Sequence, residues 1–180
     1  MPLLTVGHGT DDRGRLGDRL GAAGIEDLVD VRRFPGSRRN PDVGRDALAE
    51  WLPGLGITYR WAEPLGGRRR LPAGKPVVDD WWTVAQFAAY AAHTRSPEFA
   101  GALAEVLGAA RDRTVAVMCS EYVWWRCHRR LIADVAVLTA DTPVDHLMPD
   151  GRRTAHRPSA GAVLGADGVV RWPAADSLGG

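Results

Sequence analysis

The sequence predicts an α/β fold with three layers: a mostly parallel sheet, helices on both faces, and a small hairpin near the C-terminus. Short, almost continuously apolar runs, typical of buried parallel strands, alternate along the chain with longer segments of helical periodicity. The 180 residues have the size of one ordinary domain. An apolar content of 45 % and a charged content of 25 % exclude a disordered chain.

Five short runs are predicted as strands of the sheet. They are residues 3–6, 26–31, 57–61, 114–119 and 144–147. The run 114–119 gives the strongest signal, because four consecutive apolar residues precede Cys119. Near the end of the chain, Asp167-Gly168 between two further apolar runs predicts a hairpin over residues 163–170.

Helices are predicted between these strands, where apolar residues recur at helical spacing. Their ranges are about 10–24, 45–55, 83–93, 97–110 and 125–138. Ser96 followed by Pro97 is typical of a helix N-terminus, because serine caps the first turn and proline fits it. Residues 32–43 and 62–82 lack this periodicity and are predicted as loops, the second long enough to suggest a functional role. Residues 1–150 then form a single α/β domain, and residues 151–180 form a C-terminal extension with the hairpin and a tail.

Charge and targeting signals narrow the class of protein. The net charge of +1 excludes a strongly basic protein that coats nucleic acid by bulk charge. No apolar run reaches the roughly 18 residues that span a bilayer. The N-terminus lacks the basic region of a signal peptide. We therefore expect a cytoplasmic protein with no membrane association.

The two cysteines, Cys119 and Cys127, exclude a disulfide-rich scaffold. They lie eight residues apart, so the C-x-x-C spacing of many metal and redox sites is absent. The five histidines are scattered along the chain and form no zinc-ligand pattern with them. The sequence thus predicts neither a metal site nor a cofactor.

Four predicted loops follow the carboxyl ends of predicted strands, the edge at which open parallel sheets bind ligands. These loops are residues 7–10, 32–41, 63–70 and 119–130. We expect their side chains to meet at one edge of the sheet. The candidate catalytic residues in and beside them are His8, Asp30, Cys119, Glu121 and His128.

Two carboxylates among these candidates suit acid/base chemistry. A dry site would raise the pKa of Glu121 and let it act as a general acid or base. Alternatively, Glu121 pairs with Arg126 or Arg129. Asp30 either serves as a second catalytic carboxylate or orients Arg32.

Arginines and aromatic residues in the same loops predict a surface that binds phosphate groups and bases. Guanidinium groups hold a phosphate through two hydrogen bonds, and aromatic rings stack on bases. The candidate substrate-binding residues are Arg32, Arg33, Phe34, Arg38, Arg39, Arg68, Arg69, Trp124, Trp125 and Arg129. Two alternatives remain: the arginines pair with acidic neighbours in solvated loops, or the tryptophans anchor a homodimer interface.

Cys119 supports a different chemistry. It ends a predicted buried strand ahead of a helix, where backbone N–H groups and the helix dipole favour a thiolate. Alternatively, Cys119 is simply a small buried side chain at the end of a strand. The phosphatase loop has the spacing C-x5-R, whereas Cys119 and Arg126 have C-x6-R. The D-V-R sequence at residues 30–32, together with the later strand ending in Cys119, resembles the rhodanese pattern.

A broader resemblance covers residues 3–147. The motifs are “TVGHGT” at 5–10, “LVDVRRFPGSRRNP” at 28–41, “GI-Y” at 56–59, “LGGRR” at 65–69 and “C-x-E-x5-C-H-R” at 119–129. In this order they resemble the domain of unknown function 488 family, which implies a cytoplasmic prokaryotic α/β protein and no established reaction. Gly9 replaces the usual serine of the first motif, and apolar residues 122–125 replace a usually polar stretch.

These observations predict an enzyme that acts on a phosphate-bearing substrate, most plausibly a nucleic acid or a nucleotide. Its chemistry would be that of a hydrolase or a glycosylase, with carboxylate acid/base catalysis and arginines that hold phosphate. One alternative is a rhodanese-like or phosphatase-like thiol enzyme that uses Cys119. The other is a nucleic-acid-binding module without catalysis.

Overall fold

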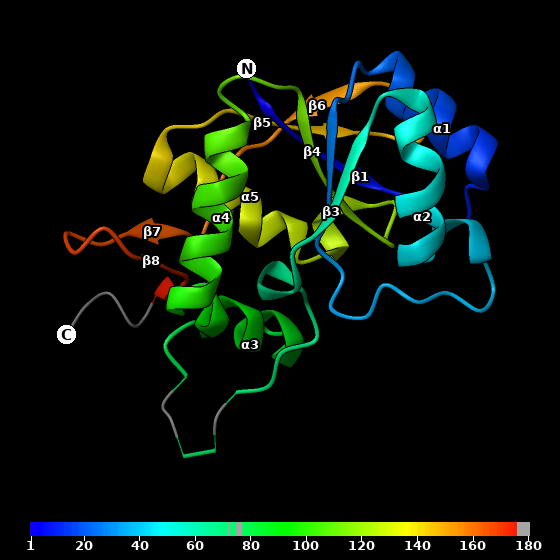
Figure 1. Cartoon of the computed structure of the whole chain (residues 1–180). Coiled ribbons are helices and arrows are strands. Elements are labelled where there is room, and N and C mark those ends of the chain that lie inside the picture. The colour runs from blue at the N-terminus through cyan, green and yellow to red at the C-terminus, as the bar shows by residue number, and fades with distance from the viewer. Residues whose placement is uncertain (72, 75–76, 176–180) are drawn as a thin grey trace.

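The computed structural model describes residues 1–71, 73–74 and 77–175. Its main sheet has six strands in the order β3-β2-β4-β1-β5-β6 (Figure 1). In chain order the strands are β1 (Leu3–Gly7), β2 (Asp27–Asp30), β3 (Thr58–Trp61), β4 (Val115–Cys119), β5 (Val144–Leu147) and β6 (Arg153–Ala155). Every neighbouring pair is parallel except β5 and β6. The predicted α/β fold with a mostly parallel sheet is confirmed.

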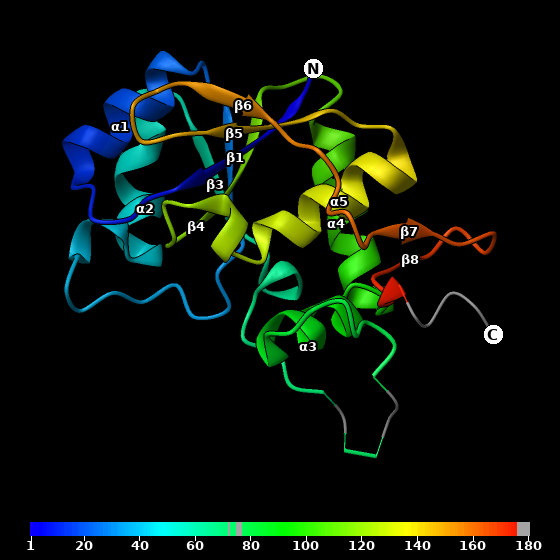
Figure 2. The same cartoon turned by 180° about the vertical axis from the view of Figure 1, so that it is seen from behind.

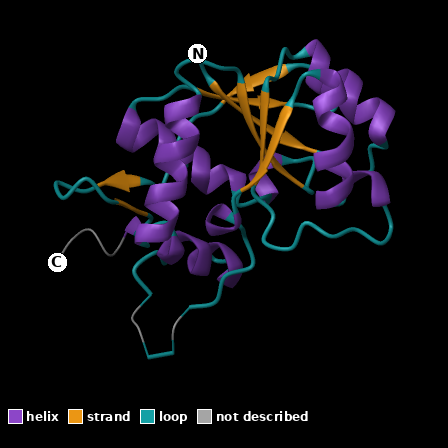
Figure 3. Ribbon diagram, viewed as in Figure 1, coloured by secondary structure: helices purple, strands orange, loops and turns teal. Residues whose placement is uncertain are grey.

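Helices cover both faces of this sheet (Figure 3). The helices α1 (Arg13–Ala22) and α2 (Arg45–Trp51) pack on one face, and the helices α3 (Ala85–His93), α4 (Pro97–Ala109) and α5 (Arg129–Ala140) lie on the other. All residues of β1, β2 and β4 are buried, because these central strands have a helical layer on each side. No helix in the described part of the chain is long and apolar enough to cross a membrane.

Helix ends follow the capping signals of the sequence. The Ser96 side chain accepts a hydrogen bond from the Phe99 N–H at 3.2 Å and starts α4, as predicted. The helix expected from residue 125 begins only at Arg129. A short 3₁₀ turn, Trp124–Arg126, precedes it, and the extended backbone of Cys127 separates the two.

The C-terminal extension contributes to the sheet and carries the predicted hairpin. The sequence does not predict β6, since its three residues are exposed and lack an apolar pattern. Backbone pairing with β5 nevertheless adds it to the sheet edge. The hairpin strands β7 (Val163–Leu164) and β8 (Val170–Arg171) pair as expected and project away from the main sheet (Figure 2). The end of the predicted tail, 176–180, lies outside the described residues.

A buried polar cluster around Asp134 of α5 attaches the extension to the domain. The Asp134 carboxylate accepts hydrogen bonds from the His156 Nε2–H at 2.8 Å, the Ser159 N–H at 2.8 Å and the Trp172 indole N–H at 2.9 Å. Asp134 and Trp172 have no exposed surface. Three residues of the extension therefore bond to one carboxylate.

Candidate functional site

A pocket of about 420 Å³ lies at the carboxyl ends of the parallel strands. Its size falls within the usual range for sites that bind small molecules and cofactors. It is lined from all four predicted loops and from α3, by His8, Arg32, Arg33, Phe34, Gly36, Ser37, Gly67, Arg68, Gln86, Phe87, Tyr90, Cys119, Ser120, Glu121, Arg126, Cys127 and His128. The fold thus brings together four of the five predicted catalytic residues.

Glycines allow the loops after β1 and β4 to approach each other closely. The two strands pair with Gly7 opposite Cys119, and the His8 N–H donates to the Cys119 carbonyl at 3.0 Å. A Cβ atom on Gly7 would collide with the backbone carbonyl of Glu121. A side chain at Gly9 would overlap the Tyr122 ring, and Gly9 also has a positive φ of 52°. The glycine that replaces serine in the first motif therefore accommodates the tyrosine of the later one.

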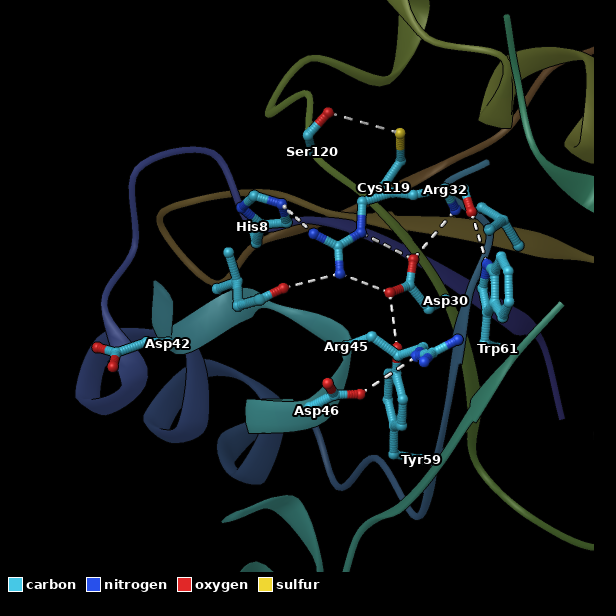
Figure 4. A network of polar contacts seen from close by, with 12 residues as sticks. His8, Asp30, Arg32, Asp42, Arg45, Asp46, Tyr59, Trp61, Cys119 and Ser120 are labelled. Atoms are coloured by element: carbon cyan, nitrogen blue, oxygen red, sulfur yellow. Dashed lines mark hydrogen bonds and ion pairs between the residues drawn. The ribbon is translucent and has the colours of Figure 1, made fainter. Parts of the chain in front are cut away.

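Asp30 and Arg32 form a buried ion pair beside the pocket (Figure 4). The Arg32 guanidinium donates to both Asp30 oxygens, through Nε at 2.8 Å and Nη2 at 2.5 Å. It also donates to the Val43 carbonyl at 2.8 Å, and the Tyr59 hydroxyl donates to Asp30 at 2.9 Å. Asp30 is fully buried and does not line the pocket. The geometry matches the second role considered for Asp30, which is to orient Arg32.

His8 completes this network as a neutral side chain. Its Nε2 lies 3.2 Å from Arg32 Nη1 and must accept a hydrogen bond, since a guanidinium only donates. Its Nδ1–H then donates to the Gly9 carbonyl at 3.0 Å. Burial, reinforced by the charge of Arg32, lowers the pKa of His8 to about 4. His8 is consequently a hydrogen-bond acceptor for Arg32 at neutral pH.

Cys119, Cys127 and His128 lie together in the wall of the pocket. One ligand-type atom from each, the two Sγ atoms and His128 Nδ1, lies within 4.8 Å of the others. His128 Nδ1 is 3.9 Å from Cys119 Sγ and 3.6 Å from Cys127 Sγ. The His128 Nε2–H donates to the Val31 carbonyl at 2.8 Å, so Nδ1 is the nitrogen that faces the sulfurs. Spacing along the chain does not reveal this group, because Cys119 ends β4 whereas Cys127 and His128 precede α5.

The two thiols differ in acidity. A hydrogen bond to Cys127 and burial raise the pKa of the Cys119 thiol well above its ordinary value. Burial also disfavours the Cys127 thiolate, but the hydrogen bond from Cys119 and the neighbouring His128 and Arg129 outweigh it. The pKa of Cys127 is therefore well below its ordinary value. Cys127, which was not among the predicted catalytic residues, is the more acidic sulfur.

Arg129 supports this cluster from inside the protein rather than binding substrate at the surface. Only 1 % of its surface is exposed, and it does not line the pocket. Its Nε–H donates to Cys127 Sγ at 3.4 Å, and one Nη2 hydrogen bond goes to the Glu121 carbonyl. Arg129 thus holds the loop after β4 in position and stabilises negative charge on Cys127.

The rim of the pocket carries charged groups without protein partners. Among the residues that the structure describes, none makes a side-chain hydrogen bond or ion pair with Glu121, Arg68 or Arg126. All three are exposed. Arg33 differs, because it donates to the Arg68 carbonyl and lies 3.4 Å from Glu63. Phe34, 64 % exposed, adds an aromatic ring to the rim.

The remaining predicted substrate-binding residues lie outside the pocket. Arg38 and Arg39 are exposed on the loop after β2. Arg69 is half-buried and pairs with Glu63 at 3.2 Å. Trp124 stacks on His146 with a ring separation of 4.0 Å, and Trp125 is exposed beside it. Neither tryptophan faces the pocket.

A shallow groove continues from the pocket along α3. It shares Arg33, Phe34, Arg68 and Gln86 with the pocket, and Arg69, Arg70 and Arg95 extend it. Asp79 neutralises Arg95 through two hydrogen bonds. Arg70 is exposed at the groove wall. A ligand longer than the pocket would meet further positive charge in this direction.

The chain matches a known protein family over most of its length. Residues 13–136, more than half of the chain, match the family described as Domain of unknown function DUF488. The chain belongs to the DUF488 family. No curated protein and no solved structure shows a significant match to it. Membership of DUF488 agrees with the resemblance that the sequence motifs suggested, and it brings no established reaction, so the chemistry rests on the residues themselves.

Proposed function

We propose that this protein is a hydrolytic enzyme that acts on a phosphate-bearing substrate, a nucleotide or a nucleic acid. The proposal rests on one observation: a carboxylate and two guanidinium groups that have no side-chain partner among the described residues line the same pocket. These are Glu121, Arg68 and Arg126. Polar groups that the fold leaves unpaired at a pocket are available for a ligand.

The pocket suits a nucleotide in charge and shape. Arg68 and Arg126 can each hold a phosphate oxygen pair through two hydrogen bonds. Phe34 and Phe87 offer aromatic surface for a base. The groove beside α3 accommodates the next part of a chain, with Arg70 exposed along it. These features support a nucleic-acid strand at least as well as a free nucleotide.

Glu121 is the acid/base candidate within this pocket, because Asp30 is committed to Arg32. In the hydrolysis, the oxygen of a water bonds to the electrophilic phosphorus or carbon atom, and the bond to the leaving group breaks. Glu121 accepts the proton that the water loses and returns one to the leaving group. Water and substrate are the only reactants, so the step balances without an oxidant or reductant.

The sulfurs favour a second candidate function, a thiol enzyme. The lowered pKa of Cys127, caused in part by its hydrogen bond from Cys119, favours a nucleophilic thiolate. The strand β2, which ends at the aspartate of the D-V-R sequence, also pairs in parallel with β4, which ends in Cys119, and this pairing is consistent with the rhodanese resemblance. In this mechanism the thiolate attacks a sulfur or phosphorus atom of the substrate and displaces its leaving group.

The first experiment is binding of labelled single-stranded DNA, double-stranded DNA and RNA over a series of salt concentrations, with each substrate analysed for nicking and base loss. A slope of about −0.7 per phosphate contact is expected for a single strand. Arg68→Ala should weaken binding and reduce the slope by about one contact. Arg111→Ala, an exposed arginine on the loop after α4, is the matched control and should change neither.

The outcomes separate the candidate functions. Binding with base loss or nicking supports the hydrolase, whereas binding without turnover indicates the non-catalytic module. Absence of binding at low salt contradicts the nucleic-acid proposal. Full activity of Cys119→Ser and Cys127→Ser proteins would exclude the thiol enzyme.

A further inference from the structure

The three groups in the wall of the pocket have the geometry of metal ligands. In a tetrahedral zinc site with a Zn–S distance of about 2.3 Å and a Zn–N distance of about 2.1 Å, sulfur and nitrogen ligand atoms lie about 3.6 Å apart. His128 Nδ1 is 3.6 Å from Cys127 Sγ and 3.9 Å from Cys119 Sγ. Both distances from His128 Nδ1 to the sulfurs are thus within a few tenths of an ångström of those in a zinc site, and the two sulfurs lie within 4.8 Å of each other.

Hydrogen bonds to neighbouring groups hold His128 and Cys127 in place, as outer-shell partners do for the ligands of a metal site. The Val31 carbonyl accepts the Nε2–H of His128, which orients the ring and leaves Nδ1 free to bind a metal. The Arg129 Nε–H donates to Cys127 Sγ at 3.4 Å. N–H donors of this kind stabilise coordinated thiolates.

Close packing also holds the imidazole in place. A Cβ atom on Gly67 would lie 2.8 Å from His128 Nδ1, so only glycine allows the loop after β3 to cover this ring. The Tyr90 ring also contacts the His128 ring edge-on, with centroids 5.0 Å apart. His128 is therefore confined to the orientation that points Nδ1 at the sulfurs.

We propose that Cys119, Cys127 and His128 bind one Zn²⁺ ion and leave its fourth position open to the pocket. Two thiolates and one imidazole select a soft or borderline metal over Mg²⁺ or Ca²⁺, which prefer oxygen ligands. Three protein ligands with an open position are typical of catalytic rather than structural zinc. No fourth histidine, cysteine or carboxylate among the described residues belongs to this cluster.

A zinc ion at this site would activate water for the proposed hydrolysis. This role of the metal rests on the proposed function, whereas metal binding itself does not. Zinc lowers the pKa of a bound water to about 7 and so supplies hydroxide at neutral pH. Glu121 lines the same pocket without belonging to the ligand group, and it can therefore accept the proton of that water. A Cys₂His zinc beside a non-ligand glutamate is also the arrangement with which zinc deaminases attack nucleobases.

The test is a metal titration of the full chain, reduced and stripped of metal by a chelator. Zinc content after reloading should reach one equivalent per chain. Co²⁺ should give the thiolate charge-transfer band and the intense visible bands of a tetrahedral site, and Zn²⁺ should abolish both. These readouts do not depend on activity, so they distinguish a failure of the metal proposal from a failure of the proposed function.

Single substitutions assign the ligands. Cys119→Ser, Cys127→Ser and His128→Asn should each weaken Co²⁺ binding by more than about 100-fold, beyond the effect of losing an outer partner. His93→Gln, which alters a half-buried histidine that bonds the Pro64 carbonyl, is the matched control and should bind Co²⁺ normally. Circular dichroism of each variant verifies that it folds.

Three results would overturn the proposal. The first is the absence of a stoichiometric Co²⁺ or Zn²⁺ complex in the folded wild-type chain. The second is a complex whose spectrum lacks the thiolate band. The third is rapid alkylation of Cys127 that saturating Zn²⁺ does not slow, which would favour the thiol enzyme.

Discussion

Two histidine clusters, one at the N-terminus of α5 and one beside Asp134 within α5, differ in how completely their polar atoms are paired. In the first, His156 Nε2 donates to Asp134, His146 Nε2 lies 2.9 Å from His156 Nδ1, and the Thr5 hydroxyl lies 2.7 Å from His146 Nδ1. Each ring nitrogen has a hydrogen-bond partner, and all four residues are buried. In the second, His128 Nδ1 faces only two sulfurs in the wall of the pocket.

This difference separates a structural cluster from a candidate site. A buried chain of complete hydrogen bonds stabilises one conformation and has no capacity left for a ligand. The sulfur cluster makes long, weak contacts to groups that bind metals or react as nucleophiles. The presence of histidines does not distinguish a structural cluster from a candidate site. The distinction comes from whether each polar atom already has a hydrogen-bond partner.

The largest loss of stability is expected in the first cluster, in which Asp134 bonds to His156, Ser159 and Trp172. Asp134→Ala removes the acceptor of three buried donors, those of His156, Ser159 and Trp172. The free energy of unfolding should fall by about 3–5 kcal/mol, because each buried donor loses its partner. Urea denaturation measures the change, and Asp18→Ala on the exposed face of α1 is the control. A loss below about 1 kcal/mol would mean that this carboxylate does not anchor the extension.

The Asp30–Arg32 pair should contribute to stability as the Asp134 cluster does, although it lies beside the pocket. Asp30→Asn leaves the buried Arg32 guanidinium without its counter-charge, and the free energy of unfolding should decrease by about 2–3 kcal/mol. The same denaturation assay measures this. A protein of unchanged stability that has lost turnover would instead identify Asp30 as a catalytic carboxylate.

Acid should destabilise the protein, because two buried histidines resist protonation: His146 in the first cluster and His8 beside Arg32. Burial, aided by the charges of His156 and Arg129, lowers the pKa of His146 to about 3, and that of His8 is about 4. Below the unfolded value of about 6.5 the unfolded chain binds protons that the folded chain does not, so stability falls with pH. At pH 5 each residue accounts for a loss of about 2 kcal/mol.

Denaturation curves at pH 7 and pH 5 test this prediction. His146→Gln should remove its share of the pH dependence, whatever its effect on stability at pH 7. Gln is chosen because it keeps a polar group at the same place without titrating. If the variant and the wild type lose the same stability between these pH values, the His146 pKa is not depressed in the folded protein.

The sequence predicts the framework of this molecule well because apolar periodicity reports burial. The strand ending in Cys119 is buried at every position and lies where the alternation of elements requires. The strand β6 escapes prediction, since its pairing with β5 comes from backbone groups and its side chains are exposed. Local patterns record side-chain burial and not backbone pairing at a sheet edge.

The sequence predicts where the residues of the candidate site lie, but it predicts only part of what each residue does there. Topology correctly brings His8, Glu121 and His128 to one pocket. Roles depend on contacts between segments distant in sequence, and no local pattern reports them. The Asp30–Arg32 pair is one example: Asp30 and the Val43 carbonyl occupy the Arg32 guanidinium, whereas Arg68 has no side-chain partner among the described residues. Cys127 is another, as its low pKa arises from Cys119 and from Arg129 behind it.

The smallest effect on stability is expected at Glu121, where the largest effect on turnover is also predicted. The Glu121 carboxylate is exposed and has no ion pair or side-chain hydrogen bond within the described chain, so Glu121→Gln should change the free energy of unfolding by less than about 0.5 kcal/mol. Removing a general acid/base should slow hydrolysis by about 10²–10⁴-fold. Glu105→Gln on the exposed face of α4 is the control. A stable Glu121→Gln protein with full turnover would exclude this carboxylate from the reaction, whereas lost turnover with intact Co²⁺ binding would separate the roles of the rim and the sulfur cluster.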